Sequence, residues 1–514
     1  MDSEGTSALL RRAGVIEASI TILGETAVGL VPGPAGWEVV AWEAPGASLP
    51  PGLAGEATEA EGGALVRAPA SHDQAAALRA AVPWLRPQLI GRATSAGVGD
   101  RLGIATPGHV AAFRANPGIF PVLAQQSARE LGRTGRSFQE VVDAATFGAL
   151  ASGWRSGYGA DADHLKTIAD IDAGMQAGCT MFTADPIELV PDLPADAPAD
   201  AIAAAFANVP WNALEDDAGA FESRYPARLD LDSGSLELPP SALRAAAARF
   251  GAAAVHVATM YRHLVSSLGP GAFEFEVAVD EIAFRTTPID HVYLATELQR
   301  LGVTWASFAP RFVGRFEKGI DYLGDAAEFE ADVEIHASIA RNFGGYKLSI
   351  HSGSDKFSIY EGAARATRGA VHLKTSGTSY LVALATIADA EPGLMRRVWE
   401  VALEAYSAAR ASYHVSAAVP GALPANELSG QALVGLLQQP NAREILHVTY
   451  GAALHGDGEG GSGELGKELR AWIWTHREEY WTSLAEHIGR HLRPFAARRS
   501  ETAWATGDRA GGGV

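Results

Sequence analysis

One recurring pattern constrains the fold of this chain more than any other feature. After about residue 99, short apolar or alternating runs recur, and each ends in polar residues and leads into an alanine-rich amphipathic stretch. We count about eight such units over about 350 residues, which favours a (β/α)8 TIM-like barrel with insertions. A doubly wound open sheet is the structural alternative. The runs are "RLGIATPGHVAAF", "SGYGADADHLKT", "CTMFTADP", "AFEFEVAVDEIAF", "VTWASFAP", "YKLSIHSGSDKF", "AVHLKTSGTSYL" and "EILHVTYG".

The remaining sequence divides the chain into three parts. Residues 1–98 contain two strand-like runs, "ASITILGETAVGLVP" and "WEVVAWEAP", and a short helix in "DQAAALRAAVPWLRP", so we expect a small N-terminal subdomain. Residues 99–496 form the predicted catalytic barrel, with a long insertion around "VPDLPADAPADAIAAAFANVPWNALEDDAGAFES". Residues 497–514, ending in "GDRAGGGV", have the composition of a flexible tail.

Charge and cysteine content exclude several classes of function. The net charge of −19 and the isoelectric point near 5.2 argue against a nucleic-acid partner or an anionic membrane surface. Cys179 is the single cysteine, which excludes an intrachain disulfide and a thiolate metal cluster and fits a cytoplasmic location. The N-terminus lacks a signal-peptide core, and no apolar run approaches the roughly 18 residues of a membrane span. A metal site would therefore use histidine and carboxylate ligands.

Acids, histidines and lysines cluster at the ends of the predicted strands, where a barrel places its active site. One histidine on an apolar strand is more often a hydrogen-bonded core residue than a ligand, but independent core histidines have no reason to choose the same strand end. Such histidines and carboxylates would suit Zn, Mn, Co or Ni, and the lysines would suit a carboxylate or phosphate. The clustered residues are Asp161, Asp163, His164, Lys166, Asp185, Glu274, Glu276, Asp280, Glu281, His351, Asp355, Lys356, His372, Lys374, His447 and Thr449.

Other familiar motifs are absent or weak. Gly458, Gly460 and Gly463 match a dinucleotide fingerprint by letter, but they lie past the strand and beside two acids, so we interpret them as a flexible loop. No nucleophile elbow, Walker A or zinc-protease motif occurs in the sequence. In "PVLAQQSARELGRTGRSF", Gln125 and Ser127 are predicted at a helix start, where capping is their expected role.

Five of the motifs together resemble the tagaturonate/fructuronate epimerase family of bacterial hexuronate catabolism. They are "YGADADHLKT", "GCTMFTADP", "LSIHSGSDKFSIY", "VHLKTSGTSYL" and "EILHVTYG", which spread over most of the chain after about residue 99. The resemblance implies a metal-dependent enzyme that interconverts two keto-hexuronates differing at one hydroxyl-bearing carbon. By the same resemblance, Asp163 is the proton acceptor, Glu276 is the proton donor, and His164 and His351 are metal ligands.

The third metal ligand and the substrate contacts are less defined. Glu317, in the loop "GRFEKGIDY", and His372 both qualify as the third ligand, and we favour Glu317. Lys166, His372 and Lys374 are expected to contact the substrate, and the lysines would bind its carboxylate, with Lys356 as a further candidate. The expected cofactor is a divalent cation: Zn, Ni, Mn or Co.

The expected reaction is epimerisation at a carbon β to a ketone, by retro-aldol cleavage and re-addition or by deprotonation and reprotonation. Alternatives are a metal-dependent ketose aldolase, an epimerase of neutral ketohexoses such as fructose and tagatose, and a non-catalytic sugar-acid-binding protein. The expected partner is a small sugar acid or ketose, with neither nucleic acid nor membrane, and a homo-oligomer is left open.

Overall fold

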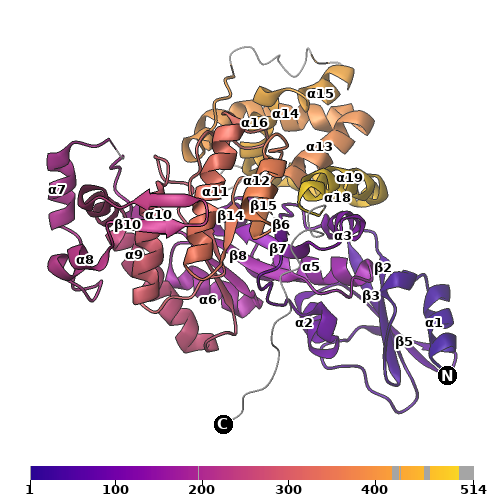
Figure 1. Cartoon of the computed structure of the whole chain (residues 1–514). Helices are drawn as coiled ribbons and strands as arrows, with labels where there is room; N and C mark the ends of the chain where they lie inside the picture. The colour runs from indigo at the N-terminus through magenta and orange to yellow at the C-terminus, as the bar shows by residue number, and fades with distance from the viewer. Residues whose placement is uncertain (1, 195, 420–427, 429, 457–462, 497–514) are drawn as a thin grey trace, which may run out of the picture.

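The chain folds around a closed parallel barrel, which confirms the predicted (β/α)8 class (Figure 1). The computed structural model describes residues 2–194, 196–419, 428, 430–456 and 463–496, so the predicted tail and most of the Gly458–Gly463 loop lie outside the described residues. The barrel strands are β6 (Ser95–Val98), β7 (Phe120–Ser127), β8 (Gly159–Leu165), β9 (Met181–Ala184), β12 (Glu274–Ala278), β13 (Ser307–Ala309), β14 (Lys347–Ile350) and β15 (Val371–Thr375). They pair in chain order, and β15 closes the ring against β6.

Strand register brings polar residues of distant segments to one level of the barrel. Glu276 of β12 lies opposite Thr183 of β9 and Ser307 of β13. Across the closing pair, Lys374 of β15 lies opposite Gly97 of β6. A Cβ atom at Gly97 would lie 2.6 Å from Oε1 of Gln125, so glycine leaves room for that amide inside the barrel. Because all strands run parallel, their carboxyl ends form one rim.

Two of the eight predicted strand runs are wrong. "RLGIATPGHVAAF" follows β6 and overlaps most of α3 (Thr106–Ala115), and "EILHVTYG" lies in α16 (Pro440–Val448) and α17 (Tyr450–Leu454). The two strands that replace them are β6, whose four residues "SAGV" are too short for a periodic signal, and β7, whose Gln125 was predicted at a helix start. The apolar residues of α16 face the C-terminal helices, and a short apolar run does not distinguish strand from buried helix.

An antiparallel sheet precedes the barrel and includes the two predicted N-terminal strand regions. Its order is β1-β2-β3-β5-β4, with bounds β1 (Thr21–Leu23), β2 (Thr26–Pro32), β3 (Trp37–Glu43), β4 (Glu56–Ala60) and β5 (Gly63–Pro69). Two helices accompany it, α1 (Ser3–Arg12) and α2 (His72–Ala81). The predicted domain boundary at residue 98 coincides with the end of β6, so the first barrel strand lies on its N-terminal side.

Helices and one insertion surround the barrel. Between β6 and β15, the helices outside the insertion are α3, α4 (Ala128–Thr134), α5 (Phe138–Ala151), α6 (Ile168–Ala177), α9 (Pro240–Leu268), α10 (Pro288–Arg300), α11 (Ala326–Asn342) and α12 (Tyr360–Thr367). The predicted long insertion after β9 holds α7 (Ala199–Ala207), α8 (Ala218–Arg224) and the hairpin β10 (Arg228–Leu231) and β11 (Gly234–Glu237). Figure 1 shows α7 and α8 at the end of the molecule away from the N-terminal sheet.

The C-terminal part of the chain is helical and closes against the N-terminal sheet. It comprises α13 (Thr378–Ala390), α14 (Pro392–Ala409), α15 (Gly430–Leu436), α16, α17, α18 (Glu464–Thr475) and α19 (Arg477–Ala496). Trp37 of β3 stacks on Trp481 of α19 with ring centroids 5.9 Å apart, and the Trp474 indole N–H donates to the Gly33 carbonyl at 2.8 Å. Among the described residues, we find no helix with the length and apolar character that crossing a membrane requires.

A buried histidine in α3 gives the fold a defined response to acid. His109 Nε2 lies 2.8 Å from the Ser379 hydroxyl of α13, and burial lowers the pKa of His109 from 6.5 to about 4. Below pH 6.5 the imidazole of His109 is protonated in the unfolded chain, whereas in the folded chain it stays neutral down to about pH 4. Stability from this group is therefore present above pH 6.5 and falls by about 1.4 kcal/mol per pH unit down to pH 4.

We predict that His109→Gln reduces the acid sensitivity of folding. Between pH 7.5 and pH 5.0 the wild-type free energy of unfolding should fall by about 2 kcal/mol more than that of the variant, as measured by urea denaturation. Equal losses in the two proteins would contradict this role for His109.

Candidate active site

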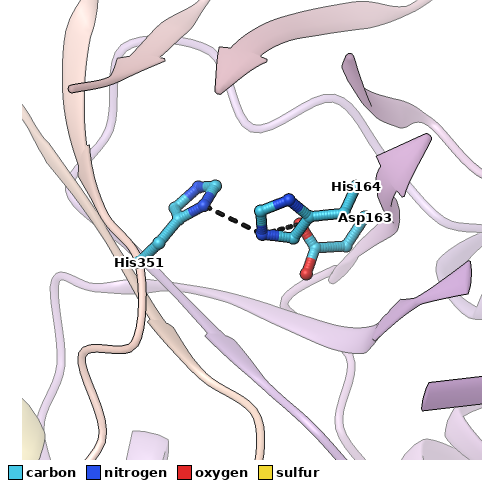
Figure 2. Close-up of side chains that lie close together, drawn as sticks. All are labelled: Asp163, His164 and His351. Atoms are coloured by element: carbon cyan, nitrogen blue, oxygen red, sulfur yellow. Dashed lines mark hydrogen bonds and ion pairs between the residues drawn. The ribbon is translucent and has the colours of Figure 1, made fainter. Parts of the chain in front are cut away.

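Two histidines meet at the rim of the barrel with ring nitrogens facing each other. His164, at the end of β8, and His351, directly after β14, have His164 Nε2 and His351 Nδ1 3.2 Å apart (Figure 2). Asp163 lies beside them, and the donor atoms of all three residues lie within 4.8 Å of one another. The structure therefore brings together three of the residues that the sequence singled out.

Strained backbone turns both imidazoles toward this point. His164 has φ of 51°, and Ser352, which follows His351, has φ of 49°. Residues other than glycine rarely occupy this left-handed region, and those that do cluster at functional sites. The β8–β9 register also shifts between Ala162 and Leu165, so the strand is irregular where it presents Asp163 and His164.

The outer nitrogen of each imidazole is directed at a carboxylate. His164 Nδ1 lies 3.3 Å from Asp185 Oδ2, and His351 Nε2 lies 2.7 Å from Glu276 Oε1. Each carboxylate accepts a hydrogen bond from the outer N–H of its imidazole. The inner nitrogen of each ring then carries a lone pair that can bind a metal ion. Two nitrogens bound to one ion at about 2.0–2.1 Å, with roughly tetrahedral angles, lie about 3.1–3.4 Å apart, so the observed separation fits a shared cation.

A further carboxylate lies at the same place. Asp280 Oδ1 is buried and forms an ion pair with His351 Nδ1 at 2.9 Å. A buried carboxylate is costly unless a cation compensates its charge. The donor set of imidazole nitrogens and carboxylates is the kind that divalent transition metals take, so these residues fit such an ion.

The acidic surroundings favour positive charge on the imidazoles. Burial alone would lower the pKa of His164, but Asp163 and Asp185 outweigh it and raise this pKa to about 10. In the same way, Asp280 and Glu276 overcome burial and raise the pKa of His351 to about 9. The centre therefore attracts a cation, whether protons on the rings or a metal between them.

Lys374 neutralises the acids inside the barrel. Its Nζ atom lies 2.8 Å from Asp161, 2.7 Å from Asp163 and 2.7 Å from Glu276, and its side chain is 3% exposed. Burial would lower the pKa of Lys374, but these carboxylates raise it well above 10.5. The pKa values of Asp163 and Glu276 are held low by Lys374 and the histidines against the effect of burial. Burial raises the pKa of Asp161 to about 6, which Lys374 only partly offsets.

Two adjoining pockets give access to this centre. The smaller, of about 20 Å³, includes Asp163, His164, His351 and Lys374 among its lining residues. The larger, of about 330 Å³, includes Asp280, Glu281 and Glu317 and the segment 412–416. Both pockets are lined by Lys318, His351, Ser352 and Tyr413, so they adjoin beside His351.

The other predicted site residues lie at different distances from the centre. Glu276 lies behind His351, where its second oxygen accepts from the Ser307 hydroxyl at 2.5 Å. Glu317 lines the larger pocket and accepts from the Ser416 hydroxyl at 2.6 Å, outside the three-residue group around His164. Lys166 is 43% exposed and pairs with Glu188 at 2.6 Å, apart from both pockets.

His372 is enclosed in the barrel interior below the rim. Its Nδ1 atom lies 2.9 Å from the Ser95 hydroxyl, its Nε2 atom has no hydrogen-bond partner among the described residues, and it lines neither pocket. Lys347 also contacts the Ser95 hydroxyl, at 3.0 Å. His372 is thus placed to support the barrel interior rather than to touch a ligand in either pocket.

Asp355 anchors the loop that follows His351. Asp355 Oδ1 lies 2.8 Å from His487 Nε2, and Asp355 Oδ2 lies 3.1 Å from the Arg443 guanidinium. The Asp355 amide donates to His491 Nε2 at 2.9 Å, while His491 Nδ1 bonds the His487 carbonyl. Because both ring nitrogens of His491 are used in this way, the cluster fixes the loop to α19.

Several pocket residues were not predicted as site residues. Lys318 and Tyr413 line both pockets, Gln125 donates to Asp163 at 3.1 Å, and Arg129 pairs with Glu281 at 2.7 Å. Gln125 and Arg129 stood in a segment predicted to be a helix, which hid their strand-end position. Lys318 directly follows Glu317, and its rarity as one of six lysines was the available signal.

Fold and site together define a (β/α)8 enzyme whose histidine, carboxylate and lysine side chains meet at the carboxyl rim of the strands. A family model described as tagaturonate epimerase matches residues 50–495. The chain belongs to the tagaturonate epimerase family.

Individual relatives match over most of their length. The tagaturonate/fructuronate epimerase of Thermotoga maritima is 38% identical over 422 residues, covering 82% of this chain and 85% of that protein. The native and the one-glycerol crystal structures of fructuronate-tagaturonate epimerase UxaE from Cohnella laeviribosi each show 35% identity, a TM-score of 0.87, and coverage of 96% of this chain and 99% of theirs.

We predict that Lys374→Met destabilises the protein by at least about 3 kcal/mol, because it leaves three buried carboxylates without their shared cation. Urea denaturation at pH 7.5 measures the loss. The matched control is Lys467→Met, which removes an exposed lysine that pairs with Glu464 and should change stability by less than about 0.5 kcal/mol. A Lys374→Met protein as stable as the control would contradict this account of the interior.

Proposed function

We propose that this protein interconverts tagaturonate and fructuronate, the two compounds named for its relatives. The observation that carries the proposal is the pair of facing imidazole nitrogens of His164 and His351 beside the Asp163–Lys374 ion pair. A buried free thiol at Cys179 supports a cytoplasmic location. The proposed partner is a single small sugar acid, and assembly into a homo-oligomer remains a separate question.

We propose that His164 and His351 hold a divalent cation, Zn, Ni, Mn or Co, in the active protein. Glu317 is the third ligand favoured from the sequence over His372, and Asp280 is a further candidate because its Oδ1 atom already lies 2.9 Å from His351 Nδ1. Glu317 would have to leave the Ser416 hydroxyl to reach the histidines. When bound, such an ion would supply Lewis-acid polarisation of a substrate carbonyl.

The chemistry proposed for the side chains follows from the carbon that changes. This carbon is β to the ketone, so its C–H bond is not acidified by the carbonyl, and simple deprotonation is unattractive. In a retro-aldol route, a base removes the proton of its hydroxyl, the bond to the neighbouring α-carbon breaks, and an aldehyde and an enediolate result. The aldehyde turns, the same bond re-forms on its other face, and the alkoxide regains the proton.

Asp163 is the proposed base because it lines the smaller pocket and is ionised. Lys374 and Gln125 each bind one of its oxygens, and Lys374 with the histidines holds its pKa low against burial, so Asp163 is in the ionised form that can accept a proton. The same contacts orient the carboxylate at the rim. When Asp163 takes a proton, Lys374 remains balanced by Asp161 and Glu276.

Glu276 is the proposed proton donor, and its burial means that its proton must pass through neighbouring groups. It is fully buried and bonded to His351, Lys374 and Ser307, so a proton reaches it through these groups rather than directly from the pocket. Its ionised form also orients His351, because the carboxylate accepts from His351 Nε2. We propose that Glu276 serves both tasks.

The direct test of the function is product analysis. Metal-reconstituted protein is incubated separately with tagaturonate, fructuronate and fructose, and products are followed by NMR. We expect each uronate to yield the other. Cleavage fragments as the end product would instead indicate an aldolase, turnover of fructose alone would indicate a neutral-ketose epimerase, and no turnover with any of the four metals would contradict an enzymatic role.

We predict that His351→Ala and His164→Ala each abolish metal retention and lower epimerase activity by at least about 100-fold, because each removes one of two facing ligand nitrogens. Metal content after dialysis, measured by mass spectrometry, separates ligand loss from other damage. The matched control is His455→Ala, a histidine at the end of α17 outside both pockets. Full activity of the wild type after exhaustive EDTA treatment would refute the metal site.

A further inference from the structure

Most cations around the two pockets are already neutralised by carboxylates. Arg101 pairs with Glu130 at 2.5 Å, and Arg315 pairs with Glu317 at 3.2 Å. Arg129 and Lys374 are paired as described above. A substrate carboxylate would compete with a protein carboxylate at each of these positions, so none of them is a ready binding point for the acid end of a sugar acid.

The chain has six lysines, and five of them are already engaged. Lys166 and Lys467 pair with exposed glutamates. Lys347 and Lys356 are buried against hydroxyl and carbonyl oxygens. Burial lowers the pKa of Lys347 and of Lys356 to about 8. With Lys374 paired three times, Lys318 is left.

Among the described residues, Lys318 is the lysine that faces a cavity without a carboxylate within ion-pair distance. Its Nζ atom bonds the Ser352 hydroxyl at 2.5 Å, and among the described residues no carboxylate oxygen lies within 4.0 Å of it. It lines both pockets and is half-buried. Because the ammonium donates to Ser352 Oγ, the serine proton is free to point at a second acceptor. Ammonium and hydroxyl together form a two-donor cradle beside His351.

The loop that carries Lys318 is fixed from both sides. The buried Lys356 ammonium donates to the Glu317 carbonyl at 2.8 Å and to the Ile320 carbonyl at 2.6 Å, and Arg443 donates to the Gly319 carbonyl at 2.6 Å. Gly319 has φ of 77°, a conformation that suits glycine, and it turns the chain directly after Lys318. This support holds the flexible lysine stem near the cavity.

In the part of the chain that the structure describes, Arg311 is the other pocket cation without an ion-paired carboxylate, and it fits the role less well. Its guanidinium donates to the Ile282 carbonyl at 2.6 Å, and burial lowers its pKa from 12.5 despite the nearby Asp280 and Glu281. Arg311 lines the larger pocket but not the smaller one. Arg311 is therefore engaged in holding the β12–α10 loop.

We infer that Lys318, with the Ser352 hydroxyl, binds the carboxylate of the substrate and sets the preference for sugar acids over neutral ketoses. This inference rests on the proposed function and names the residue that reads the acid end. It replaces the lysines expected from the sequence, because Lys166 lies outside the pockets and Lys374 is neutralised. Because Ser352 directly follows His351, a carboxylate bound there lies close to the proposed metal site, where the sugar reacts.

The test compares Lys318→Met with Lys318→Arg on charged and neutral substrates. For Lys318→Met, kcat/KM on tagaturonate should fall roughly 10- to 100-fold, mainly through KM, while kcat/KM on tagatose should change less than about 3-fold. Lys318→Arg keeps the charge and should recover part of the loss. Lys467→Met serves as the matched control and should equal the wild type.

The outcomes separate this inference from the proposed function. If Lys318→Met turns over tagaturonate as fast as the wild type, the role of Lys318 is overturned. The proposed epimerase function is unaffected by that result. Equal losses on both sugars also overturn it, because they indicate a general role. Where tagatose turns over too slowly to measure, the separate values of KM and kcat on tagaturonate decide. A rise in KM supports the inference, and a loss in kcat alone overturns it. A wild type inactive on both uronates refutes the proposed function itself.

Discussion

The ammonium group of Lys374 lies between three carboxylates inside the barrel, and the rest of the site depends on that contact. Asp161 and Asp163 come from β8 and Glu276 comes from β12, so one cation joins the acids of two strands across the barrel interior. Without it, three negative charges would face one another at low dielectric. With it, Asp163 and Glu276 stay ionised at the rim and are available to act on protons or to orient other groups.

The contacts continue outward from Lys374 in a fixed order. Glu276 accepts from His351, and Asp185 lies against His164, so each inner ring nitrogen is left facing the other. This arrangement resembles a metal site in which carboxylates orient the ligating imidazoles. The left-handed backbone at His164 is part of the same geometry, since it turns the ring off the strand direction. Strain at the rim is therefore tolerated where the buried ion pairs hold both flanking strands.

The sequence predicted the barrel and most of its rim, because parallel strands must end at one edge and their polar residues were visible in the runs. Asp163, His164 and His351 are brought together as that reasoning expected. It did not find β6 or β7, since one is four small residues and the other carries glutamines inside the barrel. It also did not foresee the state of the lysines. Whether a lysine is paired with carboxylates, like Lys374, or bonded to a hydroxyl, like Lys318, depends on partners far away in the chain.

The central claim is that the facing nitrogens of His164 and His351 share one divalent cation. The most direct measurement is a crystal structure of the metal-reconstituted protein, with diffraction data collected at the absorption edge of the added metal. We predict an anomalous peak about 2.0–2.2 Å from His164 Nε2 and from His351 Nδ1. A fully loaded protein with its peak elsewhere, or with the two imidazoles still in direct contact, would contradict it.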